Sequence, residues 1–384
     1  MDGNTILLVT VIATALAFDF TNGFHDTANA MATSITTGAL SPRIAVALSA
    51  ALNFLGAFLS LSVAATIAKG IVDSGAITLT VVFAGLVGGI CWNLLTWYLG
   101  IPSSSSHALI GGVVGATFIA AGLDAIKGDG LMSKVIVPAL LAPFAAGLVA
   151  AIGTFSVYRI TQAISTRVRD RGFRIGQIGS ASLVSLAHGT NDAQKTMGVI
   201  TLALVTNHTL NEDAETPLWV IVSCALAIAA GTAVGGWRVI RTLGKGLVEI
   251  EPPQGFAAEN SSAAVILASS YFGFPLSTTH VCSGSIIGSG VGRRLAEVRW
   301  GVAGRMATAW VLTLPAAAAV GGAAFAAANG IGGTVGAVVI FLALACFCAL
   351  LWLAARRAPV NHRNVNDEWT GSVAPTVERT PSLV

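Results

Sequence analysis

Charged residues are scarce in this sequence, and their scarcity excludes an ordinary water-soluble protein. Lys, Arg, Asp and Glu make up 10% of the 384 residues, whereas a soluble globular domain carries about 25%. The five cysteines lie in apolar segments without metal-ligand spacing, so we interpret them as core residues and predict no resident metal site and no cofactor. No nucleotide-binding signature is present, and no feature indicates a nucleic-acid partner.

Apolar residues fall in long runs, each close to or above the ~20 residues that an α-helix needs to cross a bilayer. The first run, ending at Phe20, has no Lys or Arg before it, so we interpret it as a retained helix rather than a signal peptide. We therefore predict an all-α polytopic membrane protein embedded in a lipid bilayer. The other runs are Ile44–Ala68, Ile77–Ile101, Val135–Val157, Leu218–Trp237, Val302–Ala328 and Val335–Ala355.

Two polar motifs each occur twice, in the same order. Gly23–Asp26 is matched by Gly189–Asp192, and Pro102–His107 is matched by Pro275–His280. The Asp and His of successive motifs are 81 residues apart in the first half and 88 in the second. Two matched pairs in register indicate a duplicated unit.

The charges of the loops predict that the two halves have opposite orientations. Basic segments favour the cytoplasmic side of a membrane. Arg159–Arg174 and Arg356–Arg363 are therefore predicted inside, whereas the acidic segment Asn207–Thr216 is predicted outside. The equivalent of that acidic loop in the first half carries Arg43. Equivalent loops of opposite charge are typical of an inverted-topology repeat.

We predict about 10–12 transmembrane helices, with broken or re-entrant helices at the substrate site. Segments 4–40 and 176–206 exceed one plain crossing, so both are expected to break at their Asp motifs. The C-terminus is predicted to be cytoplasmic. The predicted organisation is a first repeat (1–158), a basic cytoplasmic linker (159–175), a second repeat (176–330), an extra transmembrane helix (331–357) and a disordered tail (358–384).

Asp26 and Asp192 lie inside long apolar stretches, where an ionisable residue indicates a functional site. The alternative is that they only form hydrogen bonds between helices. For the nearby Asp19 and His188, which are not repeated, that structural alternative weighs more.

The Pro-Ser/Thr-His motifs have the composition of helix starts. Proline suits the first turn, and Ser or Thr caps the free backbone N–H groups. The alternative is an ordinary capped helix, but such a start with several hydroxyls also favours binding of phosphate. Two buried carboxylates would repel that anion unless a cation entered with it. The residues thus predict coupled symport.

The motifs resemble those of the inorganic phosphate transporter (PiT) family, most closely its bacterial low-affinity members. The matching segments are Gly23–Ala30, Ile101–Gly112, His188–Lys195 and Phe274–His280, with Trp310–Pro315 beyond them. The resemblance implies a secondary active, alternating-access importer of inorganic phosphate in a bacterial inner (plasma) membrane, forming a homodimer. It implies proton coupling with phosphate carried as a neutral complex with a divalent metal such as Mg²⁺; sodium-coupled members also exist.

We assign candidate residues on this combined basis. His25 stands where many members have Asn, and a histidine there favours coupling to protons. Glu259 stands where some relatives have a transport-linked Glu; because it lies near a predicted helix start, a role at the membrane interface is the alternative. The predicted substrate-binding residues are Ser104, Ser105, Ser106, Ser277, Thr278, Thr279, Asn29, Asn191 and Lys195. The predicted coupling-ion residues are Asp26, Asp192, His25, Thr27, His107, His280 and Glu259.

Three other functions are alternatives for such a sequence. An intramembrane hydrolase would need a nucleophile elbow, and none is present around the adjacent Ser106 and His107. An ion channel or a receptor-like structural protein is the second alternative, but the paired buried carboxylates favour coupled transport over passive conduction. A carrier of the same type for sulfate or another oxyanion stays open, as does sodium-coupled phosphate symport.

Overall fold

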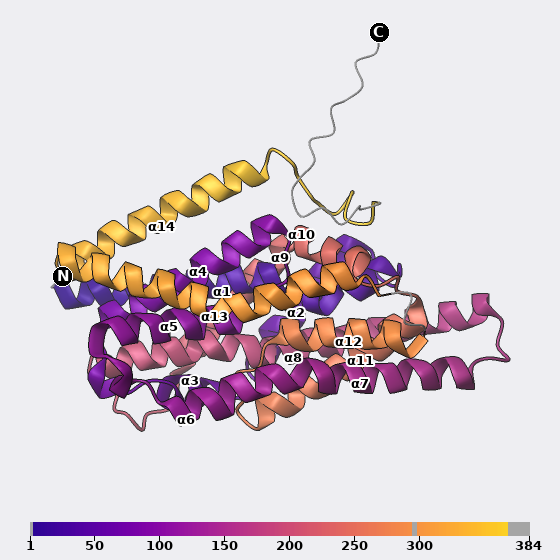
Figure 1. Ribbon diagram of the computed structural model, residues 1–384, viewed down its shortest axis with the longest axis horizontal. Helices are drawn as coiled ribbons and strands as arrows, with labels where there is room; N and C mark the ends of the chain where they lie inside the picture. Colours follow the sequence, from indigo (N-terminus) through magenta and orange to yellow (C-terminus); the bar gives the residue numbers. More distant parts are fainter. Residues whose placement is uncertain (1–2, 294–297, 368–384) are drawn as a thin grey trace, which may run out of the picture.

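The computed structural model describes residues 3–293 and 298–367, and these form a bundle of helices without a β-strand. Figure 1 shows most of the helices running along the long axis of the molecule. The α-helices are α1 (Gly3–Thr36), α2 (Pro42–Gly56), α3 (Ser62–Gly70), α4 (Leu79–Leu99), α5 (Ser105–Ala121), α6 (Gly128–Leu131), α7 (Val137–Ile160), α8 (Thr166–Thr206), α9 (Leu218–Val234), α10 (Trp237–Arg241), α11 (Pro252–Tyr271), α12 (Thr278–Arg293), α13 (Trp300–Ile331) and α14 (Gly333–Ala355). Short 3-10 or π turns are Ser74–Ala76, Leu123–Ala125, Met132–Ile136 and Thr242–Gly246.

The two halves of the chain interlock. Helix α5, which follows the first Pro-Ser motif, packs against α13 of the second half, and α12 packs against α7 of the first half. Glycines allow both close approaches, because a Cβ at Gly115 would lie 2.0 Å from the Ala318 carbonyl oxygen, and one at Gly288 would lie 2.0 Å from that of Gly147. The repeats predicted at 1–158 and 176–330 therefore share one packed body.

Helices α1 and α8 are unbroken, which corrects the prediction that they break at their Asp motifs. At about 1.5 Å per residue, their 34 and 41 residues give lengths of about 50 and 60 Å. Neither helix contains a proline, and the polar side chains of the motifs bond mainly to neighbouring helices. The intrahelical ladder of backbone hydrogen bonds is therefore kept.

The helix breaks lie one element later in each half. In the first half the chain leaves helical geometry between α2 and α3, at residues 57–61. In the second half α9 ends before Gly235, whose φ of +79° is left-handed, and the next helical segment is bent by 61°. The breaks thus lie in turns between helices rather than at the carboxylates.

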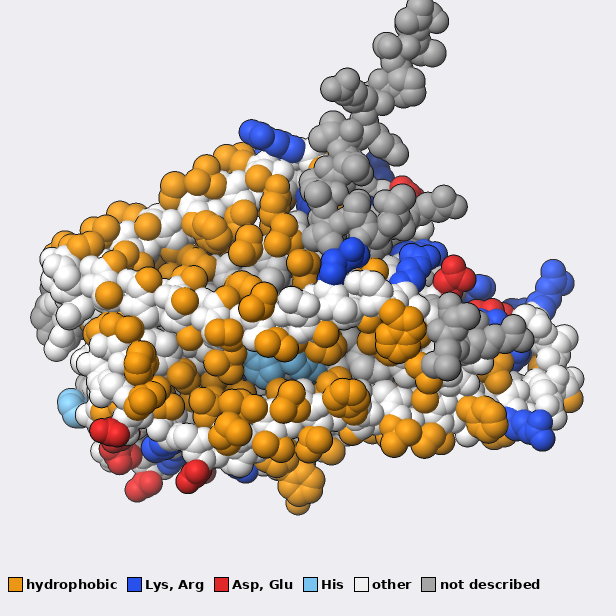
Figure 2. All heavy atoms as spheres, viewed as in Figure 1, with side chains coloured by type: hydrophobic (Ala, Val, Ile, Leu, Met, Phe, Trp, Pro, Cys, Tyr) orange, Lys and Arg blue, Asp and Glu red, His pale blue; other side chains and the backbone are white. Residues whose placement is uncertain are grey.

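Five of the described helices are long and apolar enough to span a membrane, or six if the bent pair α9 and α10 counts as one. The other predicted crossings are too short or too polar to qualify: α5 has 17 residues, and α8 has an arginine-rich start. The helical membrane class is confirmed, whereas the total of 10–12 crossings stays a prediction. Figure 2 shows hydrophobic side chains over most of the face, Lys and Arg mainly in the right-hand half, and Asp and Glu at the lower left and again at the right.

The beginning of the predicted disordered tail is ordered. Residues 358–367 form turns after α14, and Val365 is only 1% exposed. The Asn366 amide donates a hydrogen bond to the Ile35 carbonyl of α1 at 3.3 Å. The rest of the predicted tail lies outside the described residues.

Candidate functional site

The two Pro-Ser/Thr-His motifs form capped helix starts inside the molecule. Ser104 accepts a hydrogen bond from the backbone N–H of His107 at 3.1 Å, and Ser277 accepts one from that of His280 at 3.2 Å. Both serines are buried. The rings of His107 and His280 lie edge to face, with centroids 4.9 Å apart. The predicted caps are confirmed, and the two helix starts lie beside each other.

Asp26 of α1 lies between hydroxyls from both motifs. Its carboxylate accepts hydrogen bonds from Ser105 of α5 at 2.6 Å and from Thr279 of α12 at 3.4 Å. The Nδ1 atom of the neighbouring His25 is 2.5 Å from the same carboxylate. His25 also contacts Thr96 of α4 through Nε2 at 3.3 Å. Asp26 is 1% exposed.

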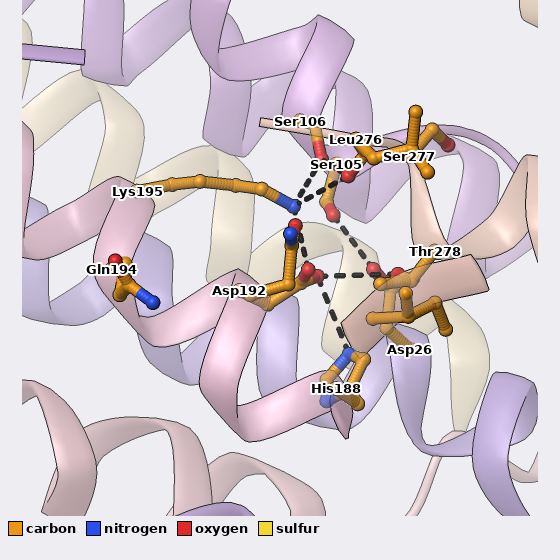
Figure 3. A network of polar contacts seen from close by, with 12 residues as sticks. Asp26, Ser105, Ser106, His188, Asp192, Gln194, Lys195, Leu276, Ser277 and Thr278 are labelled. Carbon is orange, nitrogen blue, oxygen red and sulfur yellow. Dashed lines mark hydrogen bonds and ion pairs between the residues drawn. The ribbon is translucent and has the colours of Figure 1, made fainter. Parts of the chain in front are cut away.

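Asp192 of α8 is paired with a buried lysine. The Lys195 ammonium donates hydrogen bonds to Asp192 and to Ser106, each at 2.5 Å, and to the Leu276 carbonyl at 2.9 Å (Figure 3). The other oxygen of the Asp192 carboxylate accepts a hydrogen bond from Thr278 at 3.3 Å. Lys195 and Asp192 are 1% and 0% exposed, so this ion pair is sealed from solvent.

The contacts repeat across the two halves. Each Asp accepts from a hydroxyl at the equivalent position of its own half, Ser105 for Asp26 and Thr278 for Asp192. The residue three positions after each Asp reaches the motif of the other half. Asn29 donates to Thr278 and Thr279 at 3.3 and 3.0 Å, and its counterpart Lys195 donates to Ser106. All four sequence motifs therefore meet in one buried place.

A group of cation ligands also forms here. The ligand atoms of Asp26, His188 and Asp192 all lie within 4.8 Å of one another, and all three side chains are buried. His188 Nε2 is 3.3 Å from Asp192, on the carboxylate oxygen that Lys195 leaves free (Figure 3). His188 was absent from the predicted site because its equivalent in the first half is Asn22. The sequence signal was its place directly before the Gly189–Asp192 motif.

Other predicted site residues face elsewhere. Thr27 donates to the Gly23 carbonyl of its own helix at 2.7 Å. Asn191 donates to Ser270 at 2.9 Å and to the Phe274 carbonyl at 3.2 Å, which ties α8 to the end of α11. These two residues contribute to the packing around the site.

Glu259 lies in a separate buried cage, on the side of Asp26 towards the C-terminal end of α1. Its carboxylate accepts hydrogen bonds from Thr33 at 2.6 Å and from Ser34 at 2.5 Å. Gln177 donates at 3.1 Å, and Ser180 supplies a further hydroxyl. Four donors, two from α1 and two from α8, converge on this one carboxylate. Glu259 makes none of the contacts described for the two motifs.

Comparison with known proteins identifies the architecture that carries this site. The model of the phosphate transporter family matches residues 22–321, which include all four motifs. The chain belongs to the phosphate transporter family. The Mycobacterium bovis protein named "Probable low-affinity inorganic phosphate transporter" is 63% identical over 379 residues, covering 98% of this chain and 91% of that protein.

Relatives outside the mycobacteria agree. A Bacillus subtilis protein of the same name is 45% identical over 334 residues, covering 85% of this chain and 98% of its own length. The solved structure described as "The sodium-dependent phosphate transporter" has a TM-score of 0.72 and 24% identity, covering 83% of this chain and 98% of that one. At that identity the likeness concerns the fold. This phosphate transporter family member is a transporter and not an enzyme, as the sequence predicted.

Proposed function

We propose that this protein is a secondary active importer that carries inorganic phosphate together with a cation by alternating access. The observation that carries the proposal is the meeting of two capped helix starts with two carboxylates and one lysine. The hydroxyls of Ser105, Ser106, Thr278 and Thr279 are donors suited to a tetrahedral anion, and both helix dipoles favour negative charge there. When phosphate binds, these hydroxyls would donate to the anion instead of making the hydrogen bonds within the protein that are described above.

The charges around the site indicate how much positive charge must enter together with the phosphate. Lys195 already compensates Asp192, so Asp26 is the carboxylate that most needs a positive charge when phosphate binds. We propose a proton as the coupling ion, and Na⁺ is the alternative suggested by the solved relative. The oxygen of Asp192 facing His188, together with Asp26, offers ligands to a divalent metal that enters as metal phosphate.

Uptake of radiolabelled phosphate into proteoliposomes tests this function. We expect saturable uptake that a cation gradient drives, and that collapses when the gradient is dissipated. Varying pH, Na⁺ and Mg²⁺ separately identifies the coupling ion and the form of the cargo. Excess sulfate is the control for a general oxyanion carrier. Uptake unaffected by any cation gradient would contradict symport, and full competition by sulfate would contradict selectivity for phosphate. The bacterial inner membrane and the homodimer stay predictions.

A further inference from the structure

A second buried carboxylate, Asp19, lies outside the site described above. Asp19 is 0% exposed, and neither of its oxygens has a hydrogen-bond partner. The side chains of Asn22 and Thr196 lie next to it. Both polar atoms of Asn22 and the Thr196 hydroxyl are likewise buried without partners. Four oxygen atoms from three side chains are therefore gathered here, and the donors among them, the Asn22 amide and the Thr196 hydroxyl, are neutral.

The cluster is displaced from the candidate phosphate site along the seam between α1 and α8. Asp19 precedes Asp26 by seven residues, which is two helical turns or about 10 Å on the same face. Thr196 follows Lys195 directly on α8. Glu259 lies on the opposite side of Asp26, so the Asp19 cluster is nearer the N-terminal end of α1. Figure 1 draws that end at the left.

No group of the described chain neutralises Asp19. The titratable groups that face it are Asp192 and Lys195 of α8 and the Cys224 thiol of α9. The Lys195 ammonium is committed to Asp192, Ser106 and the Leu276 carbonyl. An isolated carboxylate in an apolar interior is strongly disfavoured unless a positive charge joins it.

We propose that Asp19, Asn22 and Thr196 form a binding site for one monovalent cation, a proton or Na⁺. This inference rests on the proposed cation symport and adds a cation site separate from the one beside the phosphate. The ligands are oxygens only, as hard cations require, and they carry a single negative charge. A divalent ion would leave one positive charge uncompensated, and such ions normally take several carboxylates.

A cation bound at the Asp19 cluster should change the affinity of the candidate site for phosphate. An uncompensated charge about 10 Å away, at an effective dielectric constant of about 20, changes anion affinity by about tenfold or more. A cation on Asp19 removes that repulsion. Binding of the monovalent cation would thus promote binding of phosphate, which is the coupling that symport needs.

The test measures the cation directly on the purified full-length protein without phosphate. Wild type and Asp19→Asn are compared by equilibrium binding of ²²Na⁺ and by the infrared carbonyl band of protonated carboxylic acids. Asp213→Asn, in an exposed loop, is the matched control. We expect Asp19→Asn to lose either one saturable Na⁺ site or one carbonyl band, and these two losses distinguish Na⁺ from a proton. If Asp19→Asn and wild type agree in both measurements, the site does not exist.

Two further measurements keep the result interpretable. Thr196→Val retains the carboxylate but removes one ligand, so we expect Na⁺ affinity several-fold lower, or a shifted carbonyl band. Phosphate affinity is then measured against Na⁺ and pH. In the wild type, phosphate affinity should change about tenfold with cation concentration, and this change should be lost in Asp19→Asn. If Asp19→Asn keeps the full change, binding at the Asp19 cluster is not coupled to phosphate binding. If the wild type does not bind phosphate, the proposed function is wrong. The cation site is judged separately, because its measurements are made without phosphate.

Discussion

At the scale of single residues, the two repeated carboxylates, Asp26 and Asp192, have different partners. Asp26 has hydroxyl and imidazole partners, whereas Asp192 holds an ammonium group 2.5 Å away. Removing one member of a buried ion pair leaves the other charge uncompensated, at a cost of about 3–5 kcal/mol. Neutralising Asp192 should therefore impair folding more than neutralising Asp26 does. Both changes should impair transport to the same extent.

We expect Asp26→Asn and Asp192→Asn each to reduce phosphate uptake to background. Asp192→Asn leaves the buried Lys195 ammonium without its counter-charge, so it should also lower the amount of folded protein in the membrane. The double variant Asp192→Asn/Lys195→Met should restore the amount of folded protein without restoring uptake. Uptake is measured in cells at matched expression, with Asp213→Asn as control. Parental transport by either single variant would show that its carboxylate has no part in coupling.

The repeat determined which site residues could be predicted. Asp26 with Asp192, and Ser105 with Thr278, occupy equivalent positions, and their contacts are equivalent too. His188 and Asp19 correspond to Asn22 and Ser185, so comparison of the two halves could not single them out. Their importance comes from the crossing of α1 with α8, which a one-dimensional pattern does not contain. The structure brings the repeated residues together, and the substrate-binding and coupling roles assigned to them, as to His107, His280 and Glu259, stay predictions.

At the scale of helices, the glycines after each capped start set how closely the halves approach. Gly115 of α5 faces the Ala318 backbone of α13, and Gly288 of α12 faces the Gly147 backbone of α7. In both places a methyl group would meet a carbonyl oxygen rather than a movable side chain. The two contacts hold each motif helix against the last long helix of the opposite half.

We expect Gly115→Ala and Gly288→Ala to destabilise the protein by about 1–3 kcal/mol, the usual cost of overpacking. Gly179→Ala is the control, because a Cβ there has no neighbour within 4 Å and alanine favours a helix. Thermal unfolding of detergent-purified protein gives the comparison. A transition temperature as high as that of wild type in both motif variants would contradict the packing account.

Sequence length alone misled the prediction of helix breaks. The runs that contain the Asp motifs exceed one crossing, yet α1 and α8 stay continuous because their polar groups find partners on other helices. The breaks fall at Gly235 and in the turn after α2 instead. Predicting this would have required knowing which side chains face each other, whereas the helical class followed from the apolar runs.

At the scale of the whole molecule, the basic side chains are distributed unevenly along the long axis. Figure 2 shows most Lys and Arg in the right-hand half, whereas Asp and Glu lie both there and at the lower left. The acidic residues Glu212, Asp213 and Glu215 are exposed in the loop between α8 and α9. Basic residues favour the cytoplasmic side. This distribution supports the predicted orientation, with the α8–α9 loop outside and the linker between the halves inside.

Cysteine accessibility in intact cells tests this orientation. In a background whose five native cysteines are replaced by serine or alanine, we expect Glu212→Cys to react with a membrane-impermeant maleimide. Arg171→Cys and Arg363→Cys should react only after the cells are permeabilised. Labelling of both arginine positions from outside would contradict the orientation, and labelling of all three would point to leaky cells, which a cytoplasmic marker protein detects.

A structure determined with phosphate bound is the most direct measurement of the central claim, that the two motifs share one anion. We expect the phosphate to lie between the two helix starts, with its oxygens about 3 Å from a hydroxyl of Ser105 or Ser106 and from one of Thr278 or Thr279. Asp26 and Asp192 should lie beside it with a cation or proton between the charges. A phosphate bound elsewhere, or one held by a single motif with the other motif out of reach, would contradict the account.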